Sequence, residues 1–134
     1  MKVPSLFAAG LSRLNVSLDS LDEARFRRIT RRGNLGRVIA GIDAARAAGF
    51  SRTKLNSVVL GGQNDDELPA ICAFSWARGI VPTFIEEMPM SDGALHARGG
   101  FVSAATMRAR VVAAFGPLLP DEDQPIGAGP ARYL

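Results

Sequence analysis

Three segments of the chain have residue patterns that are typical of strands. Residues 13–19 alternate with period two, which predicts a strand with Asn15, Ser17 and Asp19 on one face. Residues 54–60 are rich in β-branched and apolar side chains and end at two glycines, and they form the second predicted strand. The third predicted strand covers residues 82–87.

Helical patterns fill the intervals between these strands. The Ser20 to Glu23 segment has the form of a capping box and predicts a helix that runs to about Arg31. Apolar residues at helical spacing predict further helices over residues 35–48, 68–78 and 104–115. Gly49 is placed to end the first of these three, and acidic residues at 64–67 suit the positive start of the next.

The alternation of strands and helices predicts an α/β fold of parallel β-α units. Three strands are too few for a closed eight-stranded barrel, which takes about 250 residues. We therefore expect a partial (β/α) barrel of the TIM-like type over residues 1–115. Four prolines and three glycines from Gly116 onward predict an irregular tail over residues 116–134.

Composition limits the chemistry that the chain can carry. Its 134 residues, 47% of them hydrophobic, suit one globular unit. The single cysteine, Cys72, excludes an internal disulfide or a multi-cysteine metal site, and its apolar surroundings predict a buried thiol. His96, the only histidine, has no ligand-like neighbours. The short apolar run at residues 6–11 predicts neither a signal peptide nor a membrane span, so we expect a cytoplasmic protein.

The net charge of +3 comes largely from five arginines between residues 25 and 32. A nucleic-acid surface is one interpretation, but no aromatic platform or known binding motif accompanies the charge. A solvated helix surface is the favoured interpretation, and anionic small molecules remain compatible partners.

Candidate reactive residues follow from the rule that α/β barrels gather them at the C-terminal ends of their strands. The rule selects Ser17 and Asp19 after the first strand and residues 86–88 after the third, with Lys54 and Asn56 as inward-facing positions on the second. Such residues could bind a phosphorylated or nucleoside ligand. Glu86 and Glu87 are adjacent in a strand and point to opposite faces, so they do not form a catalytic carboxylate pair.

Several segments together carry a specific resemblance. In order along the chain they are Leu14-Asn-Val-Ser-Leu-Asp-Ser-Leu-Asp22, Phe26-Arg-Arg-Ile-Thr30, Gly41-Ile-Asp43, Ala47-Ala-Gly49, Lys54-Leu-Asn56, Asn64-Asp-Asp-Glu67, Phe84-Ile-Glu86 and Met88-Pro-Met90. This ordered set resembles the GTP 3′,8-cyclase family, also called the molybdenum cofactor biosynthesis protein A family. The resemblance covers residues 8–90, with an echo at residues 129–133.

The resemblance implies a radical S-adenosylmethionine (SAM) enzyme of molybdopterin synthesis. In that family a [4Fe-4S] cluster cleaves SAM reductively, and the resulting deoxyadenosyl radical converts GTP to (8S)-3′,8-cyclo-7,8-dihydroguanosine 5′-triphosphate. By position, Ser17 and Met88 match residues that contact SAM, and Lys54 matches one that contacts GTP. The alternative interpretations are that Ser17 is a structural strand serine, that Met88 is a core methionine and that Lys54 is a surface lysine.

The chain also departs from the family pattern. The family's Cys-x-x-x-Cys-x-x-Cys motif and the later cysteines of its second cluster have no counterpart here, so the chain holds no cluster ligands. Thr83 replaces a ligand-contacting arginine, and Glu87 replaces an apolar or aromatic residue. We therefore interpret the chain as an internal piece of such an enzyme that has no cyclase activity alone.

Three origins or roles stay open at this point. The chain could derive from a shortened gene, an interrupted reading frame or a misassigned start at Met1. It could instead be a non-catalytic remnant that binds a partner, either a second copy or a complementing chain that covers its open sheet edges. A different radical SAM enzyme is the third interpretation.

Overall fold

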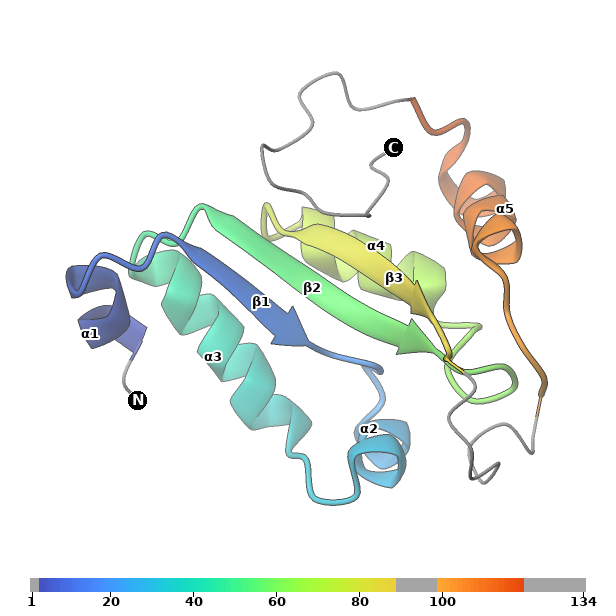
Figure 1. Cartoon of the computed structure of the whole chain (residues 1–134), viewed down its shortest axis with the longest axis horizontal. Helices are drawn as coiled ribbons and strands as arrows, with labels where there is room; N and C mark the ends of the chain where they lie inside the picture. The colour runs from blue at the N-terminus through green and yellow to red at the C-terminus, as the bar shows by residue number, and fades with distance from the viewer. Residues whose placement is uncertain (1–2, 89–98, 120–134) are drawn as a thin grey trace.

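A three-stranded parallel sheet forms the centre of the protein in a computed structural model that describes residues 3–88 and 99–119 (Figure 1). Its strands follow the chain in the order β1, β2 and β3. The elements are α1 (Val3–Ala8), β1 (Arg13–Ser17), α2 (Glu23–Thr30), α3 (Leu35–Ala47), β2 (Arg52–Val59), α4 (Leu68–Trp76), β3 (Val81–Glu86) and α5 (Ala104–Phe115). The predicted partial β/α fold is confirmed.

Strand register places matching positions side by side across the sheet. Asn15 pairs with Lys54, and Ser17 pairs with Asn56. Asn56 in turn pairs with Thr83 on β3. Because paired residues of parallel strands point to the same face, these side chains share one side of the sheet.

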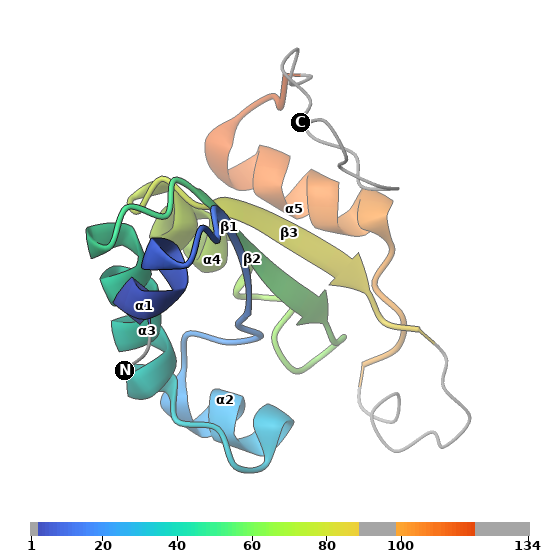
Figure 2. The same cartoon turned by 60° about the vertical axis from the view of Figure 1, so that its left-hand side comes forward.

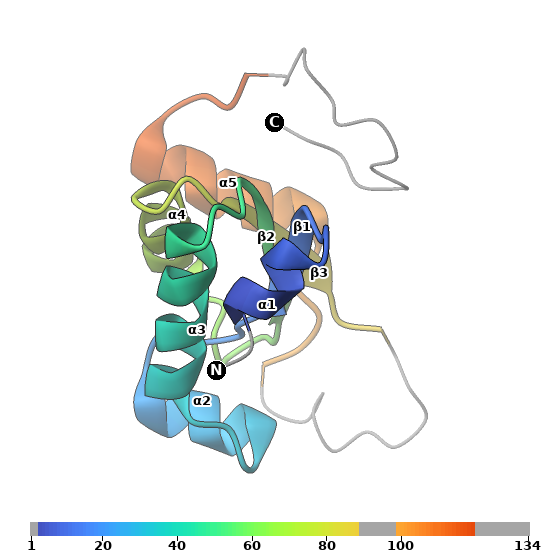
Figure 3. The same cartoon turned by 90° about the vertical axis from the view of Figure 1, so that its left-hand side faces the viewer.

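The helices α3 and α4 cover the other side of the sheet, as Figures 2 and 3 show from two directions. Leu55 of β2 is fully buried there and belongs to a core with residues of α2, α3 and α4. Val59, at the end of β2, belongs to a second core with Cys72 of α4 and Met107 of α5. The hydrophobic core therefore lies between the sheet and its helices, and α5 extends it past β3.

The predicted element positions hold to within a few residues, and α5 begins and ends where the pattern placed it. Gly49 follows α3 with φ at 100°, a conformation that glycine adopts without strain, as the pattern predicted. The short helix α1 was not predicted, because six residues hold too little of a helical repeat to reveal it.

The predicted capping box is wrong at its first residue. The N-cap of α2 is Asp22, whose carboxylate accepts from the backbone N–H of Arg25 at 2.7 Å. Ser20 instead donates its hydroxyl to Glu67. A local pattern could not reveal this bond, since the two residues are 47 positions apart.

Some predictions fall outside the described residues. These are the loop that begins at Pro89, His96, and the tail from residue 120 to residue 134, together with the segment at 129–133. Within the described part of the chain, the helices are too short or too polar for any of them to span a membrane.

Candidate functional site

The sheet face that α3 and α4 leave uncovered carries most of the predicted site. Alternate strand residues reach this face, and on β1 and β2 they are more exposed than their neighbours on the helical side. They are Arg13, Asn15 and Ser17 of β1, Lys54, Asn56 and Val58 of β2, and Val81, Thr83 and Ile85 of β3. We call this surface the open face. Its centre is a mixed array of hydroxyl, amide and ammonium groups.

Two of the three predicted ligand-contacting residues lie on the open face. Ser17 is the exposed last residue of β1, beside Asn56. Lys54 is half-buried on β2, where it pairs with Asn15, and it lies diagonal to Ser17. A hydroxyl and an ammonium group therefore face the same space, and together they can bind an anionic ligand that carries hydroxyl groups.

Met88 lies at the same end of the sheet but beyond its strand. β3 ends at Glu86, and the side chain of Met88 is 70% exposed. The alternative that Met88 is a core methionine is wrong. Its thioether stands in the loop region that follows a C-terminal strand end, where α/β barrels place ligand contacts.

Side chains continue the pairing of β1 and β2 after their regular ladder ends. Asn64, 2% exposed, donates its amide to the carbonyl oxygens of Asp19 at 2.6 Å and Val58 at 2.9 Å. Its own side-chain oxygen accepts from the backbone N–H of Leu60 at 2.7 Å. The hydroxyl of Ser57 donates to the carbonyl of Leu18 at 2.6 Å. We call this set of bonds the strand-end clamp.

Asp19 takes part in the clamp instead of facing the open side with Asn15 and Ser17. Its carboxylate accepts from the backbone N–H of Val58 at 2.8 Å. Burial raises the pKa of Asp19, and the bond from Val58 opposes this effect only in part. The carboxylate is therefore used to hold two strand ends together.

A second set of contacts fixes the loop between β1 and α2. Glu67 accepts from the hydroxyl of Ser20 and from the backbone N–H of Leu21, each at 2.7 Å. Arg25 of α2 forms ion pairs with Asp66 at 2.6 Å and Glu67 at 3.3 Å. A shallow hollow in the surface is lined by Leu21, Asp22, Arg25, Asp66 and Glu67. The hydrogen bond from Arg25 lowers the pKa of Asp66.

The acidic segment at residues 64–67 directly precedes α4, as predicted, with Glu67 as its N-cap residue, but its side chains bond to other elements. The first turn of α4 contains no acidic side chain, and Glu67 makes no capping bond to it. Asp65 pairs with Arg110 of α5 at 2.5 Å and accepts from the backbone N–H of Gly62. The segment therefore joins α2, α5 and both strand ends: Asn64 bonds the strand ends, Asp65 pairs with α5, and Asp66 and Glu67 both pair with Arg25 of α2.

Glu86 supports α5. Its carboxylate accepts from the backbone N–H of Ala104 at 2.6 Å, next to the N-cap bond that Ser103 makes with Thr106. A carboxylate at this position satisfies a free backbone N–H and suits the helix dipole. Glu86, selected by its place at a strand end, is used to hold a helix start.

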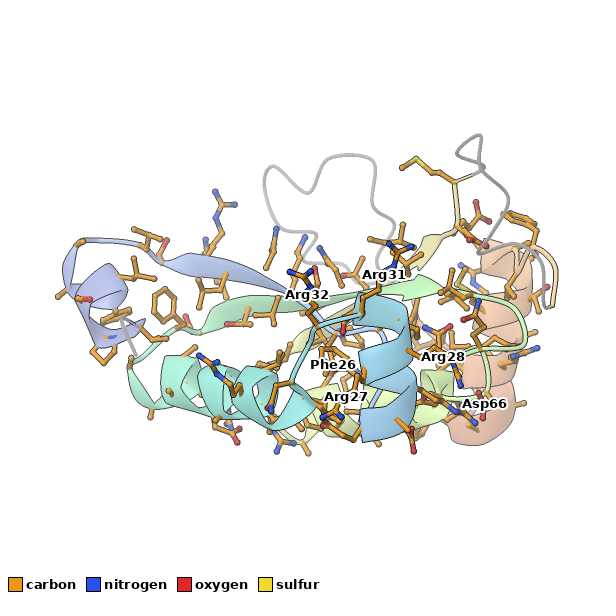
Figure 4. All side chains as sticks on the ribbon, turned by 90° about the horizontal axis from the view of Figure 1, so that it is seen from below. Phe26, Arg27, Arg28, Arg31, Arg32 and Asp66 are labelled. Carbon is orange, nitrogen blue, oxygen red and sulfur yellow. The ribbon has the colours of Figure 1, made fainter. Side chains whose placement is uncertain are left out.

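The arginines at 27, 28, 31 and 32 surround α2 and its C-terminal end (Figure 4). All four are exposed, while Phe26 of the same helix is 3% exposed and anchors it in the core. The only carboxylate within ion-pair distance of these four among the described residues is Glu23, which lies 3.6 Å from Arg27. This arrangement agrees with the predicted solvated helix surface.

Cys72 is buried in the core beside α5, as the sequence predicted. Burial raises the pKa of its thiol to about 11. A thiol in this state is a poor metal ligand, because ligation requires the thiolate. Across residues 3–88 and 99–119, no three His, Cys, Asp or Glu side chains gather in a way that could hold a metal ion.

The family model of the Radical SAM superfamily matches residues 2–75, which span β1, β2 and most of α4. This chain belongs to the radical SAM superfamily. The matched region contains Ser17, Lys54, the strand-end clamp and the contacts of Glu67.

Similar proteins narrow the relationship. A GTP 3′,8-cyclase of Pseudomonas putida is 54% identical over 129 residues, which are 96% of this chain and 38% of that protein. A protein named GTP 3′,8-cyclase 1 from Pseudomonas aeruginosa is 52% identical, and a GTP 3′,8-cyclase of Pseudomonas entomophila is 54% identical, over the same shares. The resemblance to GTP 3′,8-cyclases is confirmed, and the chain spans 38% of the length of these relatives.

The sequence pattern missed the clamp and the role of Glu67. The segment Asn64-Asp-Asp-Glu67 stood out in the resemblance, but its partners lie as far away as residue 19 and residue 110. The sequence did contain a signal that this loop is special, because Asn64 is followed by three acidic residues shortly after two glycines. The identity of the partners depends on which loops meet at the end of the sheet.

Proposed function

We propose that this chain is the part of a GTP 3′,8-cyclase barrel that contacts SAM and GTP in molybdenum cofactor biosynthesis. The open face carries the proposal. It presents Ser17 and Lys54 on the same side of a parallel sheet, diagonal to each other on neighbouring strands, in a chain about half identical to such cyclases.

The residues of the open face fit the chemistry of the two ligands. SAM and GTP both carry ribose hydroxyls and purine edges, which the hydroxyl and amide groups of Ser17, Asn56 and Thr83 can meet. The triphosphate of GTP is anionic, and Lys54 supplies a point charge for it. Met88 would add an apolar contact to SAM at the strand end.

The same chain does not fit a [4Fe-4S] cluster. Its one cysteine is buried in the core, and its thiol stays protonated below a pKa of about 11. When bound, a cluster supplies the electron that cleaves SAM. No residue here is suited to hold one, so we propose that the 134-residue chain binds ligands without turning GTP over.

Calorimetric titration with SAM and with GTP tests the binding half of this proposal. Lys54→Ala should weaken GTP binding about tenfold to a hundredfold, because a hydrogen bond to a charged group contributes about 1.5 to 3 kcal/mol. Ser17→Ala should weaken SAM binding about two- to tenfold, as for a neutral hydrogen bond. Arg37→Ala is the matched control, since it removes one exposed positive charge from α3, on the far side of the sheet.

The outcomes separate the proposal from its alternative. GTP binding that Lys54→Ala loses and Arg37→Ala keeps supports the open-face site. A chain that is folded by circular dichroism and binds neither ligand would refute it. That result would favour a non-catalytic partner-binding module, for which the outer edges of β1 and β3 are the natural surfaces, because each is paired on one side only in the described sheet.

An anaerobic assay with reconstituted cluster and reductant tests the catalytic half. We expect no cyclised product from GTP, and product formation by the chain alone would contradict us.

A further inference from the structure

The pairing of β1 with β2 changes its character just past Ser17. The regular ladder ends with Ser17 opposite Asn56, and one more backbone bond follows, from the N–H of Leu18 to the carbonyl of Asn56 at 3.0 Å. Beyond that point the two strands are joined through side chains. The site residue Ser17 is therefore the last residue of β1 in the regular ladder, one residue before the backbone pairing of the two segments ends.

Three side chains take over at this position. Ser57 binds the carbonyl of Leu18, Asp19 binds the N–H of Val58, and Asn64 binds the carbonyls of both Asp19 and Val58. Of the three, only Asn64 lies outside the two bonded segments, between β2 and α4, and it bonds to both of them. Its oxygen also closes the turn at Leu60, so that the amide donates and accepts at the same time.

The clamp is built for rigidity. Ser57 and Asn64 are 1% and 2% exposed, so water does not compete for their bonds. Buried amides with every group bonded hold their neighbours in one arrangement, and the loss of one partner leaves others unsatisfied. A lid or a flexible loop would not be fastened in this way.

We infer that Asn64 is a positioning residue, which holds Ser17 beside Asn56 and so fixes the ligand-facing end of β1 on the open face. It acts through the backbone of Asp19 and Val58 and touches no ligand itself. The inference rests on the proposed function for the identity of the ligand, but the clamp itself is independent of it. A positioning role matters because ligand contacts lose strength when a side chain is displaced by a fraction of an ångström to one ångström.

Amide hydrogen exchange of the purified chain tests the clamp without any ligand. In Asn64→Ala, the amides of Leu18 and Val58 should lose at least tenfold of their protection. Ala48, the C-cap of α3, should keep its own, since its bond to Ala44 is remote from the clamp. Asn34→Ala is the matched control. It removes another asparagine whose side chain bonds to the backbone, the N-cap of α3, which accepts from the N–H of Arg37 and makes no bond to the clamp.

Titration with SAM tests the consequence for the site. Asn64→Ala should weaken SAM binding at least fivefold, and Asn64→Asp should do the same, because it keeps the size of the side chain but cannot donate to the two carbonyls. Asn34→Ala should leave the affinity unchanged. If Asn64→Ala does not fold, Ser57→Ala removes one bond of the clamp and should give the same pattern with a smaller loss.

Each result bears on the inference. Selective loss of protection with weaker SAM binding supports it. Unchanged protection, an equal loss at Leu18, Val58 and Ala48, or lost protection with unchanged affinity would each overturn it. If the unmodified chain binds no SAM, the proposed function fails, and the exchange result still decides whether Asn64 holds the strand ends.

Discussion

The two faces of the sheet come from the same three strands but differ in chemistry and in their neighbours. On β2, Leu55 and Val59 are 0% and 2% exposed beneath the helices, while Lys54 and Asn56, one position away, reach the open face and are half-buried. The covered face is mostly apolar and is packed against helices, and the centre of the open face is polar and uncovered. This difference indicates that the covered face stabilises the fold and that the open face is available for ligands.

Truncation of neighbouring residues on the two faces should have very different costs. Leu55→Ala should lower the free energy of unfolding by about 2 to 5 kcal/mol, because it leaves a cavity in a core with no exposure to water. Asn56→Ala, on the open face, should change it by no more than about 0.5 kcal/mol. Urea denaturation followed by circular dichroism measures both. Equal losses would show that the open face also carries stability.

High pH should weaken the covered side through Cys72. Its folded pKa of about 11 lies above the unfolded reference of 9.0, so between these values the unfolded state releases a proton that the folded state keeps. Stability should therefore fall as pH rises from 9 to 11, by about 1.4 kcal/mol per pH unit from this group.

The control for this effect is Cys72→Ala, which loses packing at every pH but has no thiol to ionise. The stability advantage of the unmodified chain over Cys72→Ala should therefore shrink across the same pH window in denaturant titrations. An advantage that stays constant from pH 8 to pH 11 would mean that the thiol is not buried as the structure shows.

The smallest effect concerns a flaw in the covered face. Thr53 is 3% exposed, and its hydroxyl has no hydrogen-bond partner among the residues that the structure describes. Thr53→Val keeps the shape and should raise the free energy of unfolding by about 1 kcal/mol, since it removes an unsatisfied buried group. Thr83→Val on the open face is the matched control and should be close to neutral. Thermal unfolding compares the two, and a destabilised Thr53→Val would reveal a bond that the structure lacks.

The strand patterns were sufficient to predict the sheet and the placement of the site residues. The alternation at residues 13–19 and the strand predicted at residues 54–60 put Ser17, Lys54 and Asn56 on one side, and the register of β1 and β2 agrees. Periodicity succeeds here because one face of each strand is buried, and a shift by one residue would expose the core. The roles of Ser17, Lys54 and Met88 in ligand binding stay predictions.

The hydrogen bonds of the side chains at the strand ends could not be predicted from local patterns. Ser20 and Glu67 each suggested a helix start when considered locally, yet they bind each other across 47 residues. Asp19 was expected beside Ser17 on the open face, yet it binds the backbone of β2. Side chains at the ends of strands choose among several partners, and sequence spacing does not say which loops will be close.

The sequence by itself determined the element types, the polar face and the burial of Cys72, because these depend on local periodicity and on the avoidance of water by apolar side chains. Only the tertiary structure decided that Asn64 would bridge two strand ends and that Glu67 would fasten the loop before α2. Those bonds form between segments that meet only when β1, β2 and α4 have packed together, and their geometry is a property of the assembled sheet.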